Sequence, residues 1–324
     1  MKAMILGIIS AFFFAFTFFF NRLMENDGGS WMFSASMRFL FMVPFLLLIV
    51  YYRTGFSTLW RAIRKNPISW FIWSFVGFVL FYAPLTFAAG YAPGWLVAGT
   101  FQLTIVAGLL LSPLFWTEGS SGVRVRQGIP LRSLFSSAII LIGVVFIQVQ
   151  HASAVSVSLL LSVLPVLIAA VSYPLGNRKM MELTNGTIDT FSRVLGMTLM
   201  TTPVWIVLFV VGTLQHGLPA ASQVGQSFLV AICSGIIATL LFFSATDLSR
   251  KDPNQLAAVE ATQSGEVIFA LLLELIFLNA LFPSPVALAG ILFIVIGMIL
   301  HSFLSREKKS VGVNKKSNVS DSSV

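Results

Sequence analysis

Residues 3–20 read AMILGIISAFFFAFTFFF, a run in which no side chain carries a charge. The run extends to Met24 with Asn21 and Arg22 as its strongly polar residues, and roughly 20 predominantly apolar residues are enough for a helix to cross a bilayer. A secretory signal would carry a shorter apolar stretch followed by small residues at a cleavage site, whereas Asn21-Arg22 follow here. The stretch therefore predicts a first transmembrane helix that is retained in the protein.

The rest of the chain has the same apolar character. Of its 324 residues, 57% are hydrophobic and 10% are charged, and the mean hydropathy is +0.90. A soluble domain carries about 25% charged residues. The apolar runs are too long for barrel strands, so an all-α integral membrane protein with ten transmembrane helices is expected. The predicted spans are 4–24, 31–52, 68–90, 94–115, 133–150, 154–175, 190–213, 227–248, 254–278 and 285–304.

Basic residues are distributed unevenly between the connecting loops. With the amino terminus in the cytoplasm, all 20 Lys and Arg residues except Arg22 and Arg38 fall on the cytoplasmic side, and Arg38 alone lies inside a span. This asymmetry predicts a multi-pass plasma-membrane protein with both termini cytoplasmic. It also explains the net charge of +8 through contact with anionic lipid, so no nucleic-acid partner is expected. The polar segment 305–324 is predicted to be a disordered cytoplasmic tail.

Short motifs recur in the two halves of the chain in the same order, which predicts two five-helix repeats, 1–150 and 151–304. The matched pairs, separated by 154 to 161 residues, are Asn21 and Asn177, Arg22 and Arg178, Pro44 and Pro203, Pro93 and Pro253, Gln102 and Gln263, and Gly143 and Gly297. Because five is an odd number, the two repeats would cross the membrane in opposite directions. Inverted repeats recur in secondary transporters, where each half can adopt the conformation of the other.

Several motifs at the ends of the spans point to a known family. They are Arg38 and Pro44 in span two, Ala88-Ala89-Gly90-Tyr91-Ala92-Pro93 before span four, Ser112-Pro113 and Thr117-Glu118-Gly119 after it, and Pro283-Ser284-Pro285 with Gly290 and Gly297 at span ten. With these motifs the chain resembles the drug/metabolite transporter superfamily, in particular its ten-helix multidrug-resistance-efflux branch. The resemblance implies a secondary carrier of small organic molecules, often exporting them in exchange for protons.

In one respect the chain departs from this family. The small four-helix relatives carry their key membrane glutamate on the first helix, whereas spans one and six carry no acidic residue at mid-depth here. Proton coupling would therefore depend on span nine, which contains Glu260, Glu266 and Glu274. A charge at the centre of a bilayer costs at least ~2.5–3.5 kcal/mol, so each of these residues is a functional candidate.

Helical spacing places Glu260, Gln263 and Glu266 on one polar stripe of span nine, with Thr262 beside it. Desolvation raises the pKa of a carboxylate and an approaching cation lowers it, and a proton/cation exchanger needs both effects. We predict that Glu266, with Glu260 as second candidate, holds either a proton or the positive charge of the substrate. Gln263 and Thr262 would orient the carboxylate. The alternative is that the glutamates are neutral or paired and tie helices together, with Glu274 near the outer interface.

Two further polar residues lie within predicted spans. Arg38 could bind an anionic substrate, pair with Glu266 or Glu274, or cap carbonyl groups near Pro44. We favour the structural or gating partner, because an arginine lining the cavity would repel cationic drugs. Gln102 is predicted to make a polar contact with the substrate. The phenylalanine run of the first span could form an aromatic wall for hydrophobic cations, although such rings more often face lipid.

Other functional classes find little support in the sequence. Motifs for a nucleophile with its base, for metal-dependent hydrolysis and for nucleotide binding are missing, so no catalytic residue is predicted and the chain is not expected to be an enzyme. The single cysteine, Cys233, and three widely spaced histidines predict no metal site and no cofactor. The runner-up function is the export or import of metabolites such as amino acids.

Overall fold

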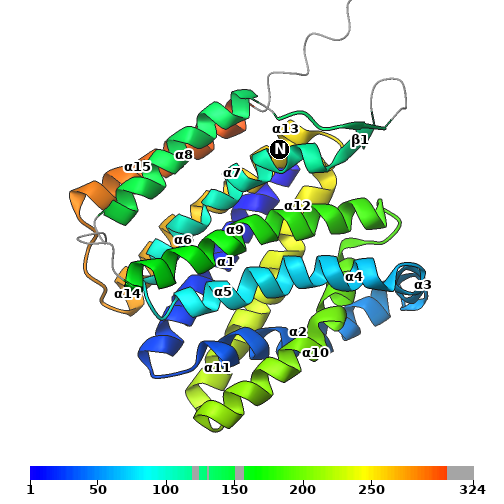
Figure 1. The fold of residues 1–324 in the computed structure, drawn as a ribbon, viewed down its shortest axis with the longest axis horizontal. Helices are drawn as coiled ribbons and strands as arrows, with labels where there is room; N and C mark the ends of the chain where they lie inside the picture. The colour runs from blue at the N-terminus through cyan, green and yellow to red at the C-terminus, as the bar shows by residue number, and fades with distance from the viewer. Residues whose placement is uncertain (119–123, 130, 150–156, 305–324) are drawn as a thin grey trace, which may run out of the picture.

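Long helices run side by side through the molecule, and the hydrophobic core lies between them (Figure 1). The structure is a computed structural model that describes residues 1–118, 124–129, 131–149 and 157–304, so the predicted tail lies outside the described residues. The helices of the first half are α1 (Lys2–Asn26), α2 (Trp31–Arg53), α3 (Ser57–Lys65), α4 (Pro67–Ser74), η1 (Phe75–Val79), α5 (Leu80–Ala88), α6 (Gly94–Phe101), α7 (Leu103–Leu110), η2 (Ser112–Leu114) and α8 (Leu131–Val149).

The second half has a similar succession of helices. They are α9 (Val157–Thr184), α10 (Thr190–His216), α11 (Ala221–Val230), η3 (Ala231–Ala238), α12 (Thr239–Ser249), α13 (Pro253–Ala261), η4 (Thr262–Ser264), α14 (Gly265–Phe277) and α15 (Pro285–Leu304). Among the described residues, six helical stretches are long and apolar enough to cross a membrane, and Gly94–Leu110, Leu134–Gln148 and Pro285–Leu300 are shorter apolar helices. The prediction of a helical membrane protein is confirmed, while the count of ten spans stays a prediction.

Helix α1 packs closely on its neighbours along one side, which is lined with small residues. Ala3, Gly7, Ala11 and Ala15 recur every four residues and are all buried. Small side chains allow helix backbones to approach closely, and the Gly7 backbone lies directly against Thr262. Contacts with η4 and α14 on one side and with η3 and α12 on another follow from this packing.

Four membrane helices contain a turn that is not α-helical. Two wider π-helical turns, η1 and η3, join α4 to α5 and α11 to α12. Two tighter turns interrupt the stretches at Gln102, between α6 and α7, and at η4, between α13 and α14. At the first of these, the Gln102 amide donates to the Gly99 carbonyl at 3.2 Å and the Gln102 carbonyl accepts from Ile105 at 3.0 Å, which are i to i+3 bonds. The two tight turns belong to helices that pack on each other, because α6 contacts α14.

Two pairs of helices from opposite halves make the most extensive contacts in the fold, α2 with α10 and α8 with α15. The second pair lies along one edge of the molecule (Figure 1). Here Gly143 and Gly290 each face the carbonyl oxygen of the other, and Gly297 lies against Ile140. A side chain at either Gly143 or Gly290 would overlap the partner backbone, so the two helices pack backbone against backbone.

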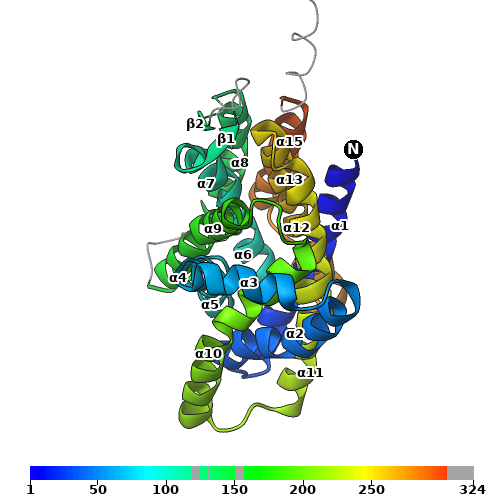
Figure 2. The same cartoon turned by 90° about the vertical axis from the view of Figure 1, so that its right-hand side faces the viewer.

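Most basic side chains gather at one end of the bundle. This basic end comprises the amino terminus, α3, the hairpin of β1 (Trp116–Glu118) and β2 (Arg124–Arg126), and the α9–α10 and α12–α13 connections (Figures 1 and 2). The sequence did not predict α3 or the hairpin, because both are too short to show a membrane-length pattern. Helix α9 also continues to Thr184, beyond the predicted end at 175, so Arg178 lies within a helix instead of a loop.

Candidate functional site

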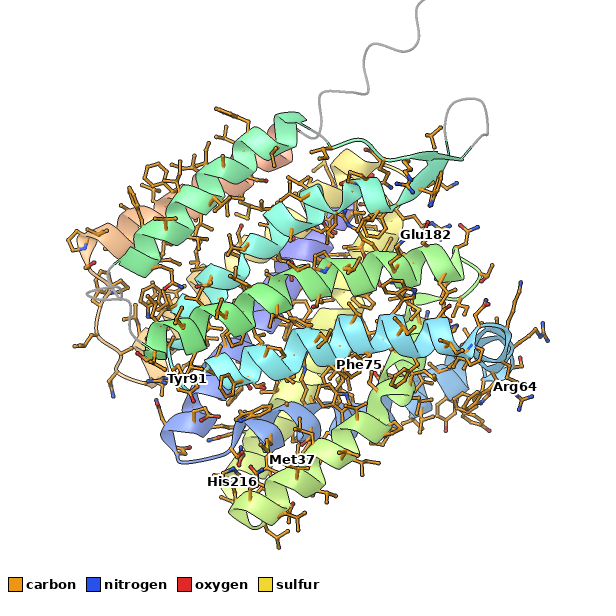
Figure 3. All side chains as sticks on the ribbon, viewed as in Figure 1. Met37, Arg64, Phe75, Tyr91, Glu182 and His216 are labelled. Atoms are coloured by element: carbon orange, nitrogen blue, oxygen red, sulfur yellow. The ribbon has the colours of Figure 1, made fainter. Side chains whose placement is uncertain are left out.

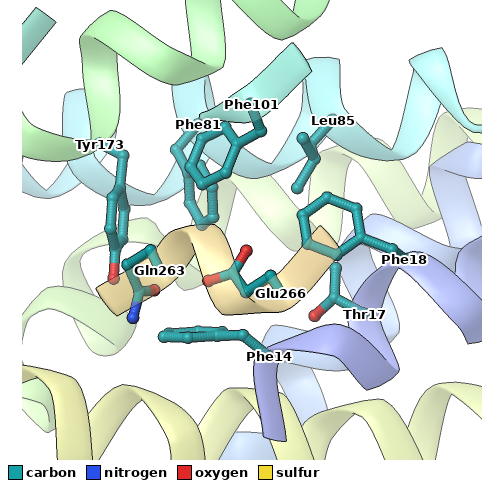
Figure 4. Close-up of a pocket in the computed structure, with 9 residues that line it drawn as sticks. All are labelled: Phe14, Thr17, Phe18, Phe81, Leu85, Phe101, Tyr173, Gln263 and Glu266. Carbon is teal, nitrogen blue, oxygen red and sulfur yellow. The ribbon is translucent and has the colours of Figure 1, made fainter. Parts of the chain in front are cut away.

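A cavity lies in the middle of the bundle, between side chains contributed by both halves of the chain (Figure 4). Its lining residues are Phe14, Thr17 and Phe18 of α1, Phe81 and Leu85 of α5, Phe101 of α6, Tyr173 of α9, Gln263 of η4 and Glu266 of α14. The cavity volume is about 10 Å³, which is close to the space that a single water molecule needs. Pockets that bind drug-sized molecules measure roughly 300–1,000 Å³, so the helices must separate before a substrate can enter.

The Glu266 carboxylate points into this cavity and lies between the Phe14 ring and the rings of Phe81 and Phe101 in Figure 4. The residue is 1% exposed, and within the described residues its carboxylate has neither a hydrogen bond nor an ion pair. Aromatic rings provide few polar groups to solvate a carboxylate, so the ionised form of Glu266 is unfavourable here unless a cation binds beside it. A proton that binds to the carboxylate removes the charge altogether. The carboxylate is therefore suited to binding a proton or a cationic group.

Aromatic rings around Tyr173 form one wall of the cavity. The Tyr173 ring lies 4.5 Å from the Phe81 ring and 6.0 Å from the Phe101 ring, and Phe14 meets it edge-on at 6.4 Å. Its hydroxyl has no hydrogen-bond partner among the described residues. Sequence reasoning missed Tyr173, although a tyrosine beside Pro174 in the middle of an apolar span was an available signal.

The phenylalanine run of α1 divides between cavity, helix contacts and surface. Phe14 and Phe18 are buried and line the cavity, whereas Phe12 is exposed. The expectation that such rings face lipid therefore holds for only part of the run. Since α1 turns by 100° per residue, consecutive phenylalanines necessarily face different surroundings.

The tight turns bring two predicted glutamines together. The Gln102 side chain donates from Nε2 to the Ala98 carbonyl at 3.0 Å and to the Gln263 carbonyl at 3.2 Å. The Gln263 side chain lines the cavity, and its amide nitrogen and oxygen have no partners within the described residues. Gln263 can therefore offer a donor and an acceptor to a ligand. Gln102 stabilises the turn through its hydrogen bond to the Gln263 carbonyl.

Thr262 was predicted to orient Glu266 but faces away from the cavity. Its hydroxyl donates to the Val259 carbonyl at 2.6 Å, and its side chain packs on Gly7 of α1. The tight turn at η4 changes the helical phase between Thr262 and Glu266, which spacing along an ideal helix does not show.

Glu260 lies outside the cavity and forms a buried ion pair with Arg178. The Arg178 Nε donates to Glu260 Oε1 at 2.8 Å, Nη2 binds Oε2, and Nη1 donates to the Gly108 carbonyl at 2.5 Å. The two side chains are 5% and 7% exposed. The prediction that Arg178 lies in a loop was therefore wrong. The alternative reading of span nine, in which a glutamate is paired and ties helices together, applies to Glu260. The pair fastens α9 to α13 and to the end of α7.

Arg38 is buried but pairs with no carboxylate among the described residues. Its Nη2 donates to Ser234 Oγ at 3.0 Å, and its guanidinium lies 4.0 Å from the centre of the Tyr82 ring. Neither predicted partner, Glu266 or Glu274, contacts it, and its Nε and Nη1 atoms have no partner within the described part of the chain. Ser234 is in turn hydrogen bonded to Thr17, which lines the cavity.

The expectation that Arg38 is the only base inside a span was also wrong. Arg178 and Arg193 are buried as well, and Arg193 Nη1 lies 2.6 Å from Asp247 Oδ1. Both are stabilised by an acidic residue on a neighbouring helix, which a rule based on charge counts in loops cannot detect.

Glu274 is 2% exposed and therefore buried within the bundle, while its expected position near the outer interface stays a prediction. Its Oε1 accepts a hydrogen bond of 2.7 Å from the Gly94 backbone amide, at the first turn of α6. Gly94 also lies against the Phe18 carbonyl, so a side chain there would collide with α1. The two ends of the α6–α7 stretch are thus each held by a glutamate of the α13–α14 stretch, Glu274 at Gly94 and Glu260 with Arg178 at Gly108.

The described residues contain no group of three or more His, Cys, Asp or Glu side chains that could hold a metal ion. The candidate site therefore consists of a carboxylate, an amide, hydroxyls and aromatic rings. Such a set can bind and release a small molecule or a proton.

Comparison with known proteins places this chain beside transporters. Residues 1–307 match the EmrE family, described as "Putative multidrug resistance efflux transporter". The uncharacterized protein YjlA of Bacillus subtilis (strain 168) is 59% identical over 95% of this chain and 97% of its own length. An uncharacterized 42.1 kDa protein of Shouchella clausii is 73% identical over 82% of this chain and 70% of its own length. A solved crystal structure has a similar fold, with a TM-score of 0.64 at 14% identity over 95% of this chain and 99% of that chain.

Proposed function

Because this chain belongs to the EmrE family of multidrug resistance efflux transporters, we propose that it exports hydrophobic or cationic small molecules in exchange for protons. A small-molecule substrate and a multi-pass position in the membrane follow from the family and from the apolar helices. The proposal adds the substrate class, the coupling ion and the direction of transport.

The observation that carries the proposal is the carboxylate of Glu266 in the central cavity. Among the described residues it has no cationic partner, although it is buried among aromatic rings. A proton can neutralise it in one step of the cycle and a substrate cation in another, and the two cannot be bound at full strength together. Because the proton and the substrate compete for this one carboxylate, export of the substrate would be coupled to import of protons.

The ring-rich wall supports a preference for hydrophobic cations. Phe14, Phe81, Phe101 and Tyr173 present aromatic faces or edges around the carboxylate. A cation held against an aromatic face gains about 0.5–2 kcal/mol, and the apolar part of a substrate gains by leaving water. Glu266 would select substrates that carry a positive charge, and the aromatic rings would select substrates by their shape.

Contacts between the halves support two inverted repeats, 1–150 and 151–304, that move by alternating access. Helix α1 contacts η3 and α12 of the second half, and α9 contacts η1 and α5 of the first. Likewise α1 packs on η4 and α14, and α9 packs on α6 and α7. The π-helical turns η1 and η3 occupy corresponding places in the two halves, as do the interruptions at Gln102 and η4.

Two polar contacts would serve as the gates of such a cycle. The Arg178–Glu260 pair closes the bundle at Gly108, towards the basic end, and Glu274 closes it at Gly94, towards the opposite end. With both contacts made, the central cavity would be separated from both ends. Breaking one contact at a time would open it alternately. The excess of Lys and Arg at the basic end supports a cytoplasmic location for that end and for both termini in the plasma membrane.

The test is transport by purified protein in liposomes with an imposed pH gradient, using lipophilic cations and amino acids as substrates. We expect lipophilic cations to move only with the gradient, and Glu266→Gln to abolish this movement. Asp27→Asn is the matched control, because it removes an exposed carboxylate at the end of α1. Gradient-driven transport by Glu266→Gln at the wild-type rate would refute the assignment.

A second candidate function is the transport of metabolites such as amino acids. The unpartnered polar groups of Gln263 and Tyr173 favour it, since a polar substrate could satisfy both. In the same assay, movement of amino acids without movement of lipophilic cations would support this candidate in place of the first.

A further inference from the structure

A second and larger cavity lies at the basic end of the bundle, with a volume of about 250 Å³. Its lining residues are Phe115, Trp116 and Gln127 around the hairpin, Arg178, Met181, Glu182 and Asn185 at the end of α9, and Arg250, Lys251 and Leu256 at the α12–α13 connection. Figure 3 shows Glu182 near the end of α9 on the side of the hairpin. This cavity shares no lining residue with the central one.

The charged groups in this cavity do not cancel. Glu182 is neutralised by Lys179, whose Nζ lies 2.8 Å from Glu182 Oε2, and Arg178 is neutralised by Glu260. Arg250 and Lys251 remain, and within the described residues neither has an ion pair with a carboxylate. The cavity therefore carries two positive charges that its own acidic residues do not balance.

The Arg250 guanidinium lies against the turn between α9 and α10. Gly186 has a φ of +70°, and a side chain at this residue would overlap the Arg250 guanidinium. The turn therefore leaves the space that the guanidinium occupies. A planar guanidinium is well suited to the oxygens of a phosphate group.

Aromatic and apolar residues border the charged part of the cavity. Trp116 is 47% exposed, and Phe115, Met181 and Leu256 supply further apolar surface. Tryptophan is enriched at the headgroup level of membranes, and basic pockets at helix ends bind anionic headgroups. The cavity thus combines a cationic side with an apolar side.

We propose that this second cavity is a binding site for a phosphate-bearing ligand, held by Arg250 and Lys251 with its apolar part against Trp116 and Leu256. A phosphodiester carries one negative charge and a phosphomonoester up to two, which matches the unbalanced charge. Two sources offer this chemistry, the headgroup of an anionic phospholipid and a soluble phosphate ester. Arg178 borders this cavity, but the two residues that hold the phosphate, Arg250 and Lys251, belong neither to the central cavity nor to the two polar contacts of the transport proposal.

Trp116 provides the reporter for a direct test on the full-length protein. The protein is placed in phosphatidylcholine vesicles that contain brominated phosphatidylglycerol or, as the neutral control, brominated phosphatidylcholine. The difference between wild type and Trp116→Phe isolates the fluorescence of Trp116 from that of the other six tryptophans of the seven in the chain. We expect the anionic lipid to quench Trp116 more strongly than the neutral lipid at the same mole fraction.

Charge variants separate this site from general attraction to the membrane surface. We expect Arg250→Gln and Lys251→Gln each to weaken the preference for phosphatidylglycerol about five-fold. The control is Arg61→Gln with Arg64→Gln, which removes two exposed charges from α3 outside the cavity. The exposed Lys251→Gln alone suffices if Arg250→Gln does not fold. Equal losses in the cavity and α3 variants would overturn the proposal.

A third arm distinguishes the two sources. Glycerol 3-phosphate and inorganic phosphate are added to the vesicles that contain brominated phosphatidylglycerol. Relief of quenching that depends on Arg250 would assign the site to soluble phosphate esters, and persistence of quenching would assign it to the lipid headgroup. If wild type shows neither lipid preference nor a phosphate-dependent change in Trp116 fluorescence, the site does not exist.

Discussion

Removing one member of the Arg178–Glu260 pair should strongly destabilise the protein. In Glu260→Gln the Arg178 guanidinium keeps its bond to the Gly108 carbonyl but loses its counter-charge. Both side chains are less than one tenth exposed, so water cannot take the place of the carboxylate. Breaking a buried pair in this way costs about 3–5 kcal/mol. For a chain of this size we expect a fall in the unfolding temperature on the order of 10 °C.

The single cysteine of the chain provides the assay. Cys233 is partly buried in η3, so a thiol-reactive fluorogenic dye would report its exposure on heating in detergent. Arg178→Met combined with Glu260→Met leaves no lone charge, and we expect it to be clearly more stable than the sum of the single variants implies. Asp247→Asn is the comparison at a wetter pair, because Asp247 is 23% exposed and its loss should cost less. A Glu260→Gln protein as stable as wild type, or strict additivity in the double variant, would refute this reasoning.

Three further predictions follow from the packing and the polar contacts. Gly143→Val should lower stability by about 1–3 kcal/mol because its side chain would meet the Gly290 carbonyl, whereas Gly225→Val, in open space, should behave as wild type in the same thermal assay. Glu274→Ala should cost about 1–3 kcal/mol by leaving a buried amide unpaired, and Glu274→Gln, which keeps an acceptor, should lose less; equal losses would contradict the role of that hydrogen bond. Tyr173→Phe removes a hydroxyl that has no partner among the described residues, so thermal stability should be unchanged or higher by about 1 kcal/mol, while an increased KM in liposome transport would show that the hydroxyl contacts substrate.

The sequence was most informative where one physical requirement dominates. A helix in hydrocarbon needs a minimum apolar length, and the predicted bounds of 31–52 and 285–304 differ from α2 and α15 by no more than one residue at either end. Glu266 and Gln263 were selected as polar residues on an apolar helix, and the structure brings both to the central cavity.

The remaining features depend on tertiary contacts that a single sequence does not reveal. The turn at η4 is tightened where α13 and α14 pack against α1, and it turns Thr262 away from Glu266. The burial of Arg178 depends on Glu260, which is 82 residues away in the chain. Asp247 and Arg193 form a comparable pair, which loop charge alone assigns to the surface.

The contact between Gly143 and Gly290 limits how the molecule can change shape. Backbone meets backbone there, and the Ile147 and Ile294 side chains fill the space beside the contact, so little room is left for a tilt. We expect α8 and α15, one from each half of the chain, to move together as one rigid unit. The rearrangement that admits a ligand must then come from sliding elsewhere, among α1, α6, α9 and α14, whose ends are fastened by reversible polar contacts.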